Sequence, residues 1–383
     1  MFIGLLVWVI KTHKQNRTPI VYQGYQVNGI VFQNTVRHGP VCHYLSAAYN
    51  LSNLQDQMIT DGFGRIHDYL RISLTDACNF RCTYCMPDED MHFMPSSRLM
   101  RPDEIETIAT QFVKMGVRKI RLTGGEPLVR KDAKDIIQRL SALPVELTLT
   151  TNGARAAEFI PTFHQAGIKS INVSLDTLDP KTFFKITRRD VFQTVMDTIL
   201  LLVQEGFHVK VNAVVMRGVN DHELADFGAL TKDLPLHVRF IEFMPFDGNH
   251  WENQKVISYG EMLEQLSGQY DFVKLLDEAH ATSKKYKVYG HAGTFAMIAT
   301  MSAPFCSSCN RMRLTADGKM KNCLFSKGET DLLTALRHGD DLVPLIEQCI
   351  HEKEEALGGQ FTAAYQDIDP DTLHNRSMIR IGG

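Results

Sequence analysis

The sequence predicts an α/β protein in which helices cover a parallel β-sheet. From residue 69 onwards, six short apolar runs alternate with longer amphipathic segments. Cysteines, glycines or polar residues that could form an active site end or follow each run. Near-continuous apolar runs are typical of strands that are buried on both faces of a parallel sheet. Six such units fit either a partial (β/α) barrel or an open doubly wound sheet, and periodicity alone does not choose between them.

Taken in order, the predicted strands span residues 70–74, 119–122, 145–149, 168–175, 209–215 and 238–243. The predicted helices span residues 102–115, 133–143, 154–166, 191–205 and 221–233. Unusual residues follow or end the six strands at positions 78–85, 123–127, 150–153, 174–176, 215–220 and 242–245. Because the carboxyl ends of parallel strands meet at one face, we expect the active site there.

The 383 residues are enough for one large or two medium domains, and the net charge of −3 gives no general affinity for nucleic acid or acidic membranes. Residues 1–10 are apolar but too short to span a bilayer, and residues 11–57 show no clear period or motif. We predict a poorly ordered or artefactual N-terminal extension over residues 1–57, with Met58 near the true start. A partial barrel over residues 58–250 and a C-terminal region over residues 251–383 complete the prediction.

The first predicted strand is followed by three cysteines in the spacing CxxxCxxC, the first cysteine set: Cys78, Cys82 and Cys85. Three thiolates this close can hold three irons of a cubane cluster and leave the fourth iron without a protein ligand. The alternatives are buried thiols or a structural zinc site. A closed zinc site needs four ligands, and no fourth Cys or His lies at suitable local spacing, although a remote ligand stays open. Disulfides are not expected, because the chain has no credible export signal.

The second cysteine set lies near the C-terminus and consists of Cys306, Cys309 and Cys323. Asp317-Gly318 between them is a strong hairpin signal, which brings the three cysteines together. Arg311 and Arg313 lie two apart on a predicted strand and point to the same face beside the metal. A zinc ribbon with Cys349 or a histidine as fourth ligand is the alternative. Since only three cysteines are local, the pattern favours a second cluster with an open iron.

Basic residues lie at predicted strand ends or beside the second cysteine set, although the protein is slightly acidic: Arg71, Arg121, Lys210, Arg311 and Arg313. Arginine binds phosphate through bidentate charge-assisted hydrogen bonds. Each residue alone is typical of a solvated surface, but together on one rim they indicate an anion site. The sequence contains no GxxxxGK[ST] loop, so a P-loop NTPase is not supported.

The first cysteine set resembles the signature of radical S-adenosylmethionine (SAM) enzymes. The segment Gly124-Gly125-Glu126-Pro127, one strand and helix later, is similar to the one that holds the amino end of SAM in that superfamily. By itself this segment is an ordinary turn before a helix. The resemblance implies a partial (β/α)6 barrel of the radical SAM type, with SAM on the open iron as the source of a 5′-deoxyadenosyl radical.

Both cysteine sets, the Gly-Gly-Glu-Pro segment, the triplet 311–313 and the terminal Gly382-Gly383 together resemble the GTP 3′,8-cyclase family, molybdenum cofactor biosynthesis protein A, over about residues 61–383. The resemblance implies a lyase that converts GTP to (8S)-3′,8-cyclo-7,8-dihydroguanosine 5′-triphosphate, the first step of molybdenum cofactor (molybdopterin) biosynthesis. The adenosyl radical removes hydrogen from C3′, the ribose radical attacks C8, and the second cluster holds the guanine.

Carried over to this sequence, the resemblance assigns the first cysteine set to the SAM cluster and the second to the GTP cluster. The implied SAM contacts are Tyr84, Gly125, Ser174 and Met244. The implied GTP contacts are Arg71, Arg121, Thr150, Lys210, Arg311, Met312 and Arg313. Because the family places its C-terminal tail in the active site, the implied catalytic residues are Arg71, Arg311, Arg313, Gly382 and Gly383.

The implied cofactors are SAM and two 4Fe–4S clusters, with GTP as substrate and an external one-electron reductant. We expect a cytoplasmic homodimer without nucleic-acid or membrane partners, and as a protein partner the next enzyme of the pathway, cyclic pyranopterin monophosphate synthase. The runner-up is a radical SAM enzyme with an auxiliary cluster that acts on a peptide, although Arg-x-Arg favours a nucleotide. A zinc-binding nucleic-acid module is the alternative from another class, and the lack of a basic stripe with aromatics argues against it.

Overall fold

The computed structural model describes residues 7–11, 20–27, 30–34, 58–88, 91–361, 364–369 and 372–382. The chain divides into two compact units, Met1–Asp56 and Gln57–Gly383. In the first unit, β1 (Val7–Lys11), β2 (Ile20–Val27) and β3 (Ile30–Asn34) form an antiparallel sheet in the order β1-β2-β3. These strands were not among the predicted elements. Cys42 and Gly383 lie outside the described residues.

Six parallel strands form the centre of the second unit: β4 (Tyr69–Ser73), β5 (Lys119–Thr123), β6 (Glu146–Thr151), β7 (Ser170–Ser174), β8 (His208–Val215) and β9 (His237–Glu242). They are neighbours in the order in which they follow in the chain. A doubly wound sheet reverses this order at a switch point, whereas a (β/α) barrel does not. The strand order therefore confirms the partial (β/α)6 barrel arrangement.

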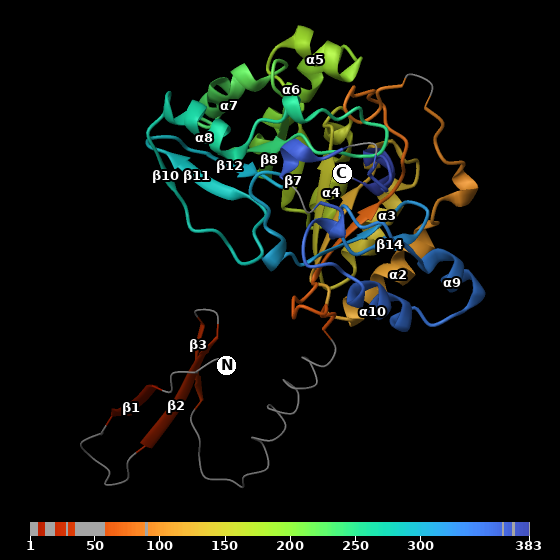
Figure 1. Cartoon of the computed structure of the whole chain (residues 1–383). Coiled ribbons are helices and arrows are strands. Elements are labelled where there is room, and N and C mark those ends of the chain that lie inside the picture. The colour runs from red at the N-terminus through yellow and green to blue at the C-terminus, as the bar shows by residue number, and fades with distance from the viewer. Residues whose placement is uncertain are drawn as a thin grey trace. The chain divides into compact units, whose positions relative to one another are not determined.

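The helices that connect these strands are α2 (Pro102–Lys114), α3 (Ala133–Ser141), α4 (Ile160–Gln165), α5 (Pro180–Thr187), α6 (Phe192–Gln204) and α7 (Leu224–Leu230). All of them except α5 overlap a predicted helix. The side chain of Asp179 caps α5 by accepting a hydrogen bond from the Thr182 amide at 2.8 Å, and Pro180 occupies its first turn. Figure 1 shows α5, α6 and α7 on the outer side of β7 and β8.

The C-terminal region extends both edges of the parallel sheet. Its elements are α8 (Tyr259–Ser267), β10 (Phe272–Lys274), β11 (Lys284–Val288), β12 (Thr294–Ile298), β13 (Arg311–Leu314), β14 (Lys319–Lys321), β15 (Thr330–Asp331), α9 (Leu332–His338), α10 (Val343–His351) and α11 (Met378–Ile381). β12 pairs in parallel with β9, and β13 pairs in parallel with β4. β13 and β14 pair in antiparallel register, Arg313 opposite Lys321, which confirms the predicted hairpin around Asp317-Gly318.

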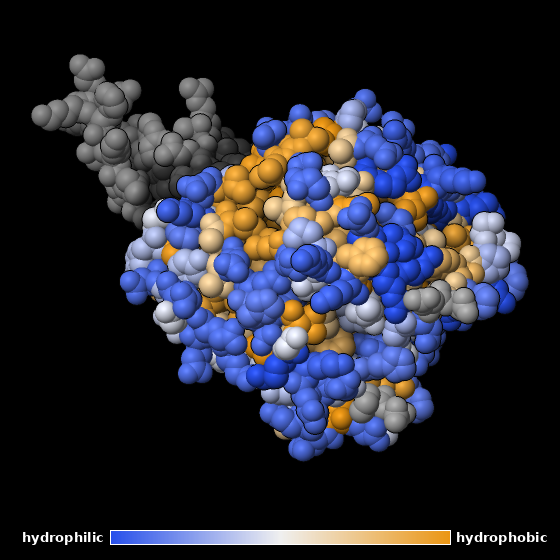
Figure 2. All heavy atoms as spheres, turned by 90° about the horizontal axis from the view of Figure 1, so that it is seen from above, coloured by the Kyte–Doolittle hydropathy of each residue, from blue (hydrophilic) through white to orange (hydrophobic). Residues whose placement is uncertain are grey.

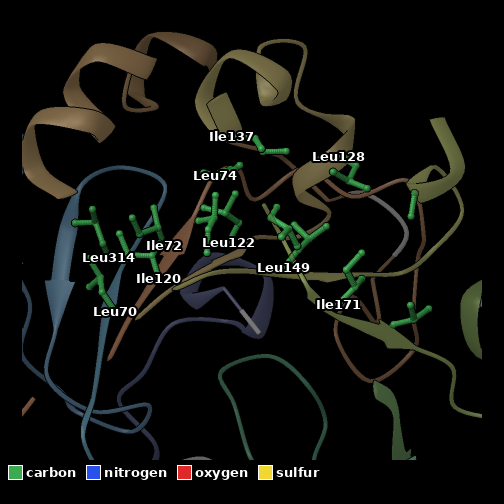
Figure 3. Packing of buried hydrophobic residues seen from close by; sticks show 14 of the residues in the cluster. Leu70, Ile72, Leu74, Ile120, Leu122, Leu128, Ile137, Leu149, Ile171 and Leu314 are labelled. Atoms are coloured by element: carbon green, nitrogen blue, oxygen red, sulfur yellow. The ribbon is translucent and has the colours of Figure 1, made fainter. Parts of the chain in front are cut away.

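The core lies between the strands and the surrounding helices. Leu70, Ile72, Ile120 and Leu122 from β4 and β5 are fully buried and belong to the same core cluster as Ile137 of α3 (Figure 3). The residues between them on each strand are polar and face the interior of the barrel. Figure 2 shows hydrophilic residues over most of one face of the molecule. No helix in the described part of the chain is long and apolar enough to cross a membrane.

Candidate functional site

A cavity of about 400 Å³ lies inside the barrel. It is lined by inward-facing residues of β4 to β9 and by all six cysteines of the two sets. The cavity has the size of a typical small-molecule site. Every cysteine in the described part of the chain is a free thiol.

The two cysteine sets lie at opposite ends of the barrel strands. The first set follows β4, so it lies at the carboxyl ends of the strands. Cys306 and Cys309 precede β13, which runs parallel to β4 with Arg311 opposite Tyr69. They therefore lie at the amino ends. The expectation that the site occupies the carboxyl face alone was incomplete, because the second set extends it to the other end.

Backbone contacts with the Gly-Gly segment hold the start of the first cysteine loop. The Gly125 amide donates to the Thr75 carbonyl at 2.7 Å, and the Glu126 amide donates to the Ala77 carbonyl at 2.9 Å. A side chain at Gly125 would place its Cβ 2.5 Å from the Ala77 carbonyl oxygen. Only glycine allows this close approach, which sets the position of the adjoining Cys78.

The far side of the same loop is held by the end of α5. The amides of Arg81 and Thr83 donate to the carbonyls of Thr187 and Ile186, each at 2.9 Å. The Arg189 guanidinium donates to the Asn79 carbonyl at 2.7 Å. The helix that the sequence analysis missed therefore supports the predicted cluster loop.

The first set fits a cubane cluster. The Cys78 sulfur accepts hydrogen bonds from the Phe80 amide at 3.4 Å and from Asn152 Nδ2 at 3.8 Å, as cluster thiolates commonly do. Burial raises the pKa of Cys78 to about 11 and raises the pKa values of Cys82 and Cys85. These thiols are therefore protonated at neutral pH until a metal displaces the protons.

Among the described residues, no group of three or more His, Cys, Asp or Glu side chains is arranged to hold a single metal ion. A cubane cluster binds each thiolate to a different iron, so its ligands do not converge on one point.

All four predicted SAM contacts line the cavity: Tyr84, Gly125, Ser174 and Met244. The Tyr84 hydroxyl donates to Asp176 at 2.7 Å, and burial raises the pKa of Asp176 to about 6. Glu126 belongs to the segment that resembles the one holding the amino end of SAM, and its carboxylate could accept from an ammonium group. In the structure its carboxylate accepts from the Leu128 amide, the Thr151 hydroxyl and the Asn152 amide, so the protein itself uses both oxygens.

The predicted GTP contacts line the cavity except for Met312: Arg71, Arg121, Thr150, Lys210, Arg311 and Arg313. Arg313, Arg71 and Arg121 lie side by side in register on β13, β4 and β5. Arg71 and Arg121 are the central residues of their strands, so the prediction that they lie at strand ends was wrong. Alternation along each strand turns them into the barrel. The Met312 side chain packs in the core on the opposite face.

The buried cations inside the barrel repel one another, so each lowers the pKa values of its neighbours. Burial and the charges of Arg239 and Arg121 lower the pKa of Lys210 to about 8. Burial and Arg121 lower the pKa of Arg239 to about 9, and burial lowers that of Arg71 to about 10. Within the described ranges, no carboxylate forms an ion pair with Lys210 or Arg239. A buried set of like charges indicates an anionic ligand.

Several lining residues were not predicted, among them Arg239, Tyr69 and Lys119. Two guanidinium nitrogens of Arg239 are buried without a hydrogen-bond partner in the described structure. Arg239 lies inside the predicted strand 238–243, where one arginine in an apolar run is the signal that could have found it. Burial raises the pKa of Tyr69, but the charges of Arg121 and Arg71 outweigh this and lower it to about 7.

The second set also has donors aimed at sulfur. The Leu357 amide donates to Cys306 Sγ at 3.4 Å, and Arg311 donates to Cys309 Sγ at 3.8 Å. Burial raises the pKa of Cys309, but the charges of Arg311 and Lys353 and the hydrogen bonds from Arg311 together outweigh burial and lower the pKa to about 7. Cys349 is buried elsewhere and does not line the cavity.

The C-terminal tail reaches the same cavity. The Gly382 carbonyl accepts a hydrogen bond from Arg313 Nη1 at 2.6 Å, and Met378 and Ile379 line the cavity. Arg376 anchors this tail to the hairpin region: it donates to Asp317 at 2.7 and 3.0 Å and to Glu329 at 2.5 and 2.6 Å. The structure therefore brings Gly382 beside the predicted arginines.

Comparisons with known proteins agree with this geometry. Residues 72–230 match the Radical SAM superfamily model, and residues 236–358 match the Molybdenum Cofactor Synthesis C model. The chain is 43% identical over 348 residues to "GTP 3',8-cyclase, mitochondrial" of Arabidopsis thaliana, covering 88% of this chain and 87% of that protein. The chain belongs to the GTP 3′,8-cyclase family. This confirms the predicted family, and radical SAM membership implies a 4Fe–4S cluster and SAM as cofactors.

Some relatives of this chain are longer than the chain itself. It is 47% identical over 331 residues to "Molybdenum cofactor biosynthesis protein 1" of Mus musculus, covering 85% of this chain and 51% of the mouse protein. The chain thus spans about half the length of that relative. Streptococcus suis SuiB bound to S-adenosylmethionine has the same fold, with a TM-score of 0.52, 14% identity, and coverage of 91% of this chain and 84% of SuiB.

Proposed function

We propose that the chain is a GTP 3′,8-cyclase, which converts GTP to (8S)-3′,8-cyclo-7,8-dihydroguanosine 5′-triphosphate in the first step of molybdenum cofactor biosynthesis. One arrangement supports this most directly: a single cavity has a cysteine set at each end and buried cations between them. Both the Arabidopsis relative and a relative from Rhodopirellula baltica, 42% identical over 94% of that protein, are named GTP 3′,8-cyclase, which agrees with this proposal.

The first cysteine set would hold the SAM cluster, with Tyr84, Gly125, Ser174 and Met244 around SAM. When bound, the cluster and SAM supply a 5′-deoxyadenosyl radical. The close contact of Gly125 with the Ala77 carbonyl fixes the loop that carries these ligands. The barrel wall keeps the radical source away from water, which is the protein's contribution to a reaction whose hard step belongs to the cofactor.

The cations at mid-strand would bind the triphosphate. Arg71, Arg121, Lys210 and Arg239 face the cavity, and Thr150 adds a hydroxyl. Arginine pairs with phosphate oxygens through two parallel hydrogen bonds, which fixes orientation as well as affinity. Binding of the polyanion relieves the repulsion among these buried charges.

The second cysteine set would hold a second 4Fe–4S cluster whose open iron takes the guanine. Arg311 and Arg313 lie beside it, and Arg313 also holds the Gly382 carbonyl. With the guanine at the second cysteine set and SAM at the first, C3′ of the ribose would lie near the radical source. This positioning turns an intermolecular hydrogen abstraction into an effectively unimolecular step.

The proposed partners are an external one-electron reductant, a second copy of the chain in a homodimer, and the next enzyme of the pathway. The Arabidopsis relative is named as mitochondrial, whereas we keep the cytoplasm as the proposed location of this chain. Mass measurement by light scattering tests the dimer, and labelling of the protein in its native cell tests the location.

The function is tested by anaerobic reconstitution with iron and sulfide, followed by incubation with dithionite, SAM and GTP. We expect 5′-deoxyadenosine together with an isomer that has the mass of GTP, both detected by mass spectrometry. Formation of 5′-deoxyadenosine while GTP stays unaltered would refute the cyclase and return the peptide substrate to consideration. An Arg71→Ala variant serves as a control, because it should retain both clusters and lose the isomer.

A further inference from the structure

Lys353 lies two residues after the end of α10 and is almost fully buried, with 4% of its surface exposed. Its ammonium group donates to the Asn322 carbonyl and to the Arg311 carbonyl, the latter at 3.3 Å. Asn322 precedes Cys323, and Arg311 follows Cys309 by two residues. One buried cation therefore joins the two chain segments that carry these cysteines.

The residues that follow Lys353 contact the remaining cysteine of the set, Cys306. The Leu357 amide donates to Cys306 Sγ at 3.4 Å. Arg65 Nη1 donates to the carbonyls of Cys306 at 2.9 Å and Glu355 at 2.6 Å, and Nη2 donates to the Glu354 carbonyl at 2.9 Å. We call residues 353–357 the ligand strap, because Leu357 contacts Cys306 itself and Lys353 contacts carbonyls within two residues of the other two cysteines.

The charge of Lys353 has no carboxylate partner in the described part of the chain, since both of its hydrogen bonds go to carbonyls. Three thiolates give a cluster site an excess of negative charge, and reduction adds one more electron. A nearby buried cation favours the reduced form, because net charge and hydrogen bonding set the potential of an iron–sulfur cluster.

We propose that Lys353 is a positioning residue for the second cluster, which holds the ligand segments in register and raises the reduction potential of the cluster. This inference rests on the proposed function, which assigns a cluster to the second cysteine set. The lysine acts through backbone carbonyls and charge and does not itself ligate iron.

The test uses the full chain with Cys78, Cys82 and Cys85 replaced by serine, so that only the second set binds iron. In this background Lys353→Met removes the charge and the donors, and Lys353→Arg retains both. Lys327→Met removes an exposed lysine of the same region and is the matched control. The readouts are iron and sulfide per chain after anaerobic reconstitution, and the midpoint potential from a redox titration followed by electron paramagnetic resonance.

For Lys353→Met we expect loss of most of the iron and, in the fraction that retains it, a shift to lower potential, with an unchanged circular dichroism spectrum. Lys353→Arg should restore the potential, and Lys327→Met should match the parent. Lys353→Met with the iron content and potential of the parent would overturn the inference, as would Lys353→Arg with the shift of Lys353→Met. A parent that binds no iron would refute the second cluster itself.

Discussion

Replacing Gly125 with alanine should separate the first cluster from the rest of the fold. The new Cβ would lie 2.5 Å from the carbonyl oxygens of Asp76 and Ala77, so one of the two backbone segments must move. That movement breaks the hydrogen bonds from the Gly125 amide to Thr75 and from the Glu126 amide to Ala77. Two buried hydrogen bonds left unmade cost about 2–6 kcal/mol, which is smaller than the stability of most domains.

The strain falls on the residue before Cys78, so we expect the Gly125→Ala variant to fold but to lose the iron of the first cluster. It should also fail to bind SAM in equilibrium dialysis and produce no 5′-deoxyadenosine with dithionite. Gly260→Ala is the matched control: Gly260 lies in α8 with no heavy atom within 4 Å of an added Cβ, and alanine suits a helix. Parental iron content and SAM affinity in Gly125→Ala would refute this account of the loop.

Three further changes have defined outcomes. Arg376→Ala should cost about 3–5 kcal/mol and speed hydrogen exchange in the C-terminal tail, because it leaves two mostly buried carboxylates without their partner. Replacement of the exposed Arg380 by alanine should have neither effect, and equal exchange in both variants would contradict the anchor. Arg239→Ala should weaken GTP binding about 10- to 150-fold in anaerobic calorimetry, the value of a charge-assisted hydrogen bond, and unchanged affinity would remove Arg239 from the site. Burial lowers the pKa of His67 from about 6.5 to about 4, so between these pH values the unfolded chain binds a proton that the native state does not. The free energy of unfolding from urea titrations should therefore fall by up to about 3 kcal/mol as pH drops from about 6.5 to about 4. A flat profile, or the same slope in His67→Gln, would show that His67 is not responsible.

The sequence predicted the six barrel strands and most connecting helices, because strands buried under helices leave apolar runs with clear ends. It placed Arg71 and Arg121 at strand ends, whereas both lie at mid-strand. A charged residue inside an apolar run looks like a boundary when the barrel interior is not known to be polar. Arg239 was overlooked because an interior of the barrel lined by charged residues was not expected, although it is one of the buried cations that line the cavity.

The contacts of the ligand strap could not be predicted from short stretches of sequence. Arg65 contacts Cys306 across 241 residues of sequence, and Lys353 contacts Asn322 across 31. Hydrogen bonds to backbone carbonyls leave no pattern of residue types, since any residue supplies a carbonyl. The cysteines were visible because metal chemistry restricts the ligands, while the groups that position them follow only from the fold.

The distribution of these contacts along the chain has a consequence for biosynthesis. The first cysteine loop rests on residues 75–77, 125–126, 152 and 186–189, all of which are translated before the second cysteine set. The second set needs Lys353 and Leu357, which are translated only after all six barrel strands. We therefore expect the contacts that support the first cysteine loop to form before those of the second set, and a chain that is truncated before the ligand strap would keep the former and lack the latter.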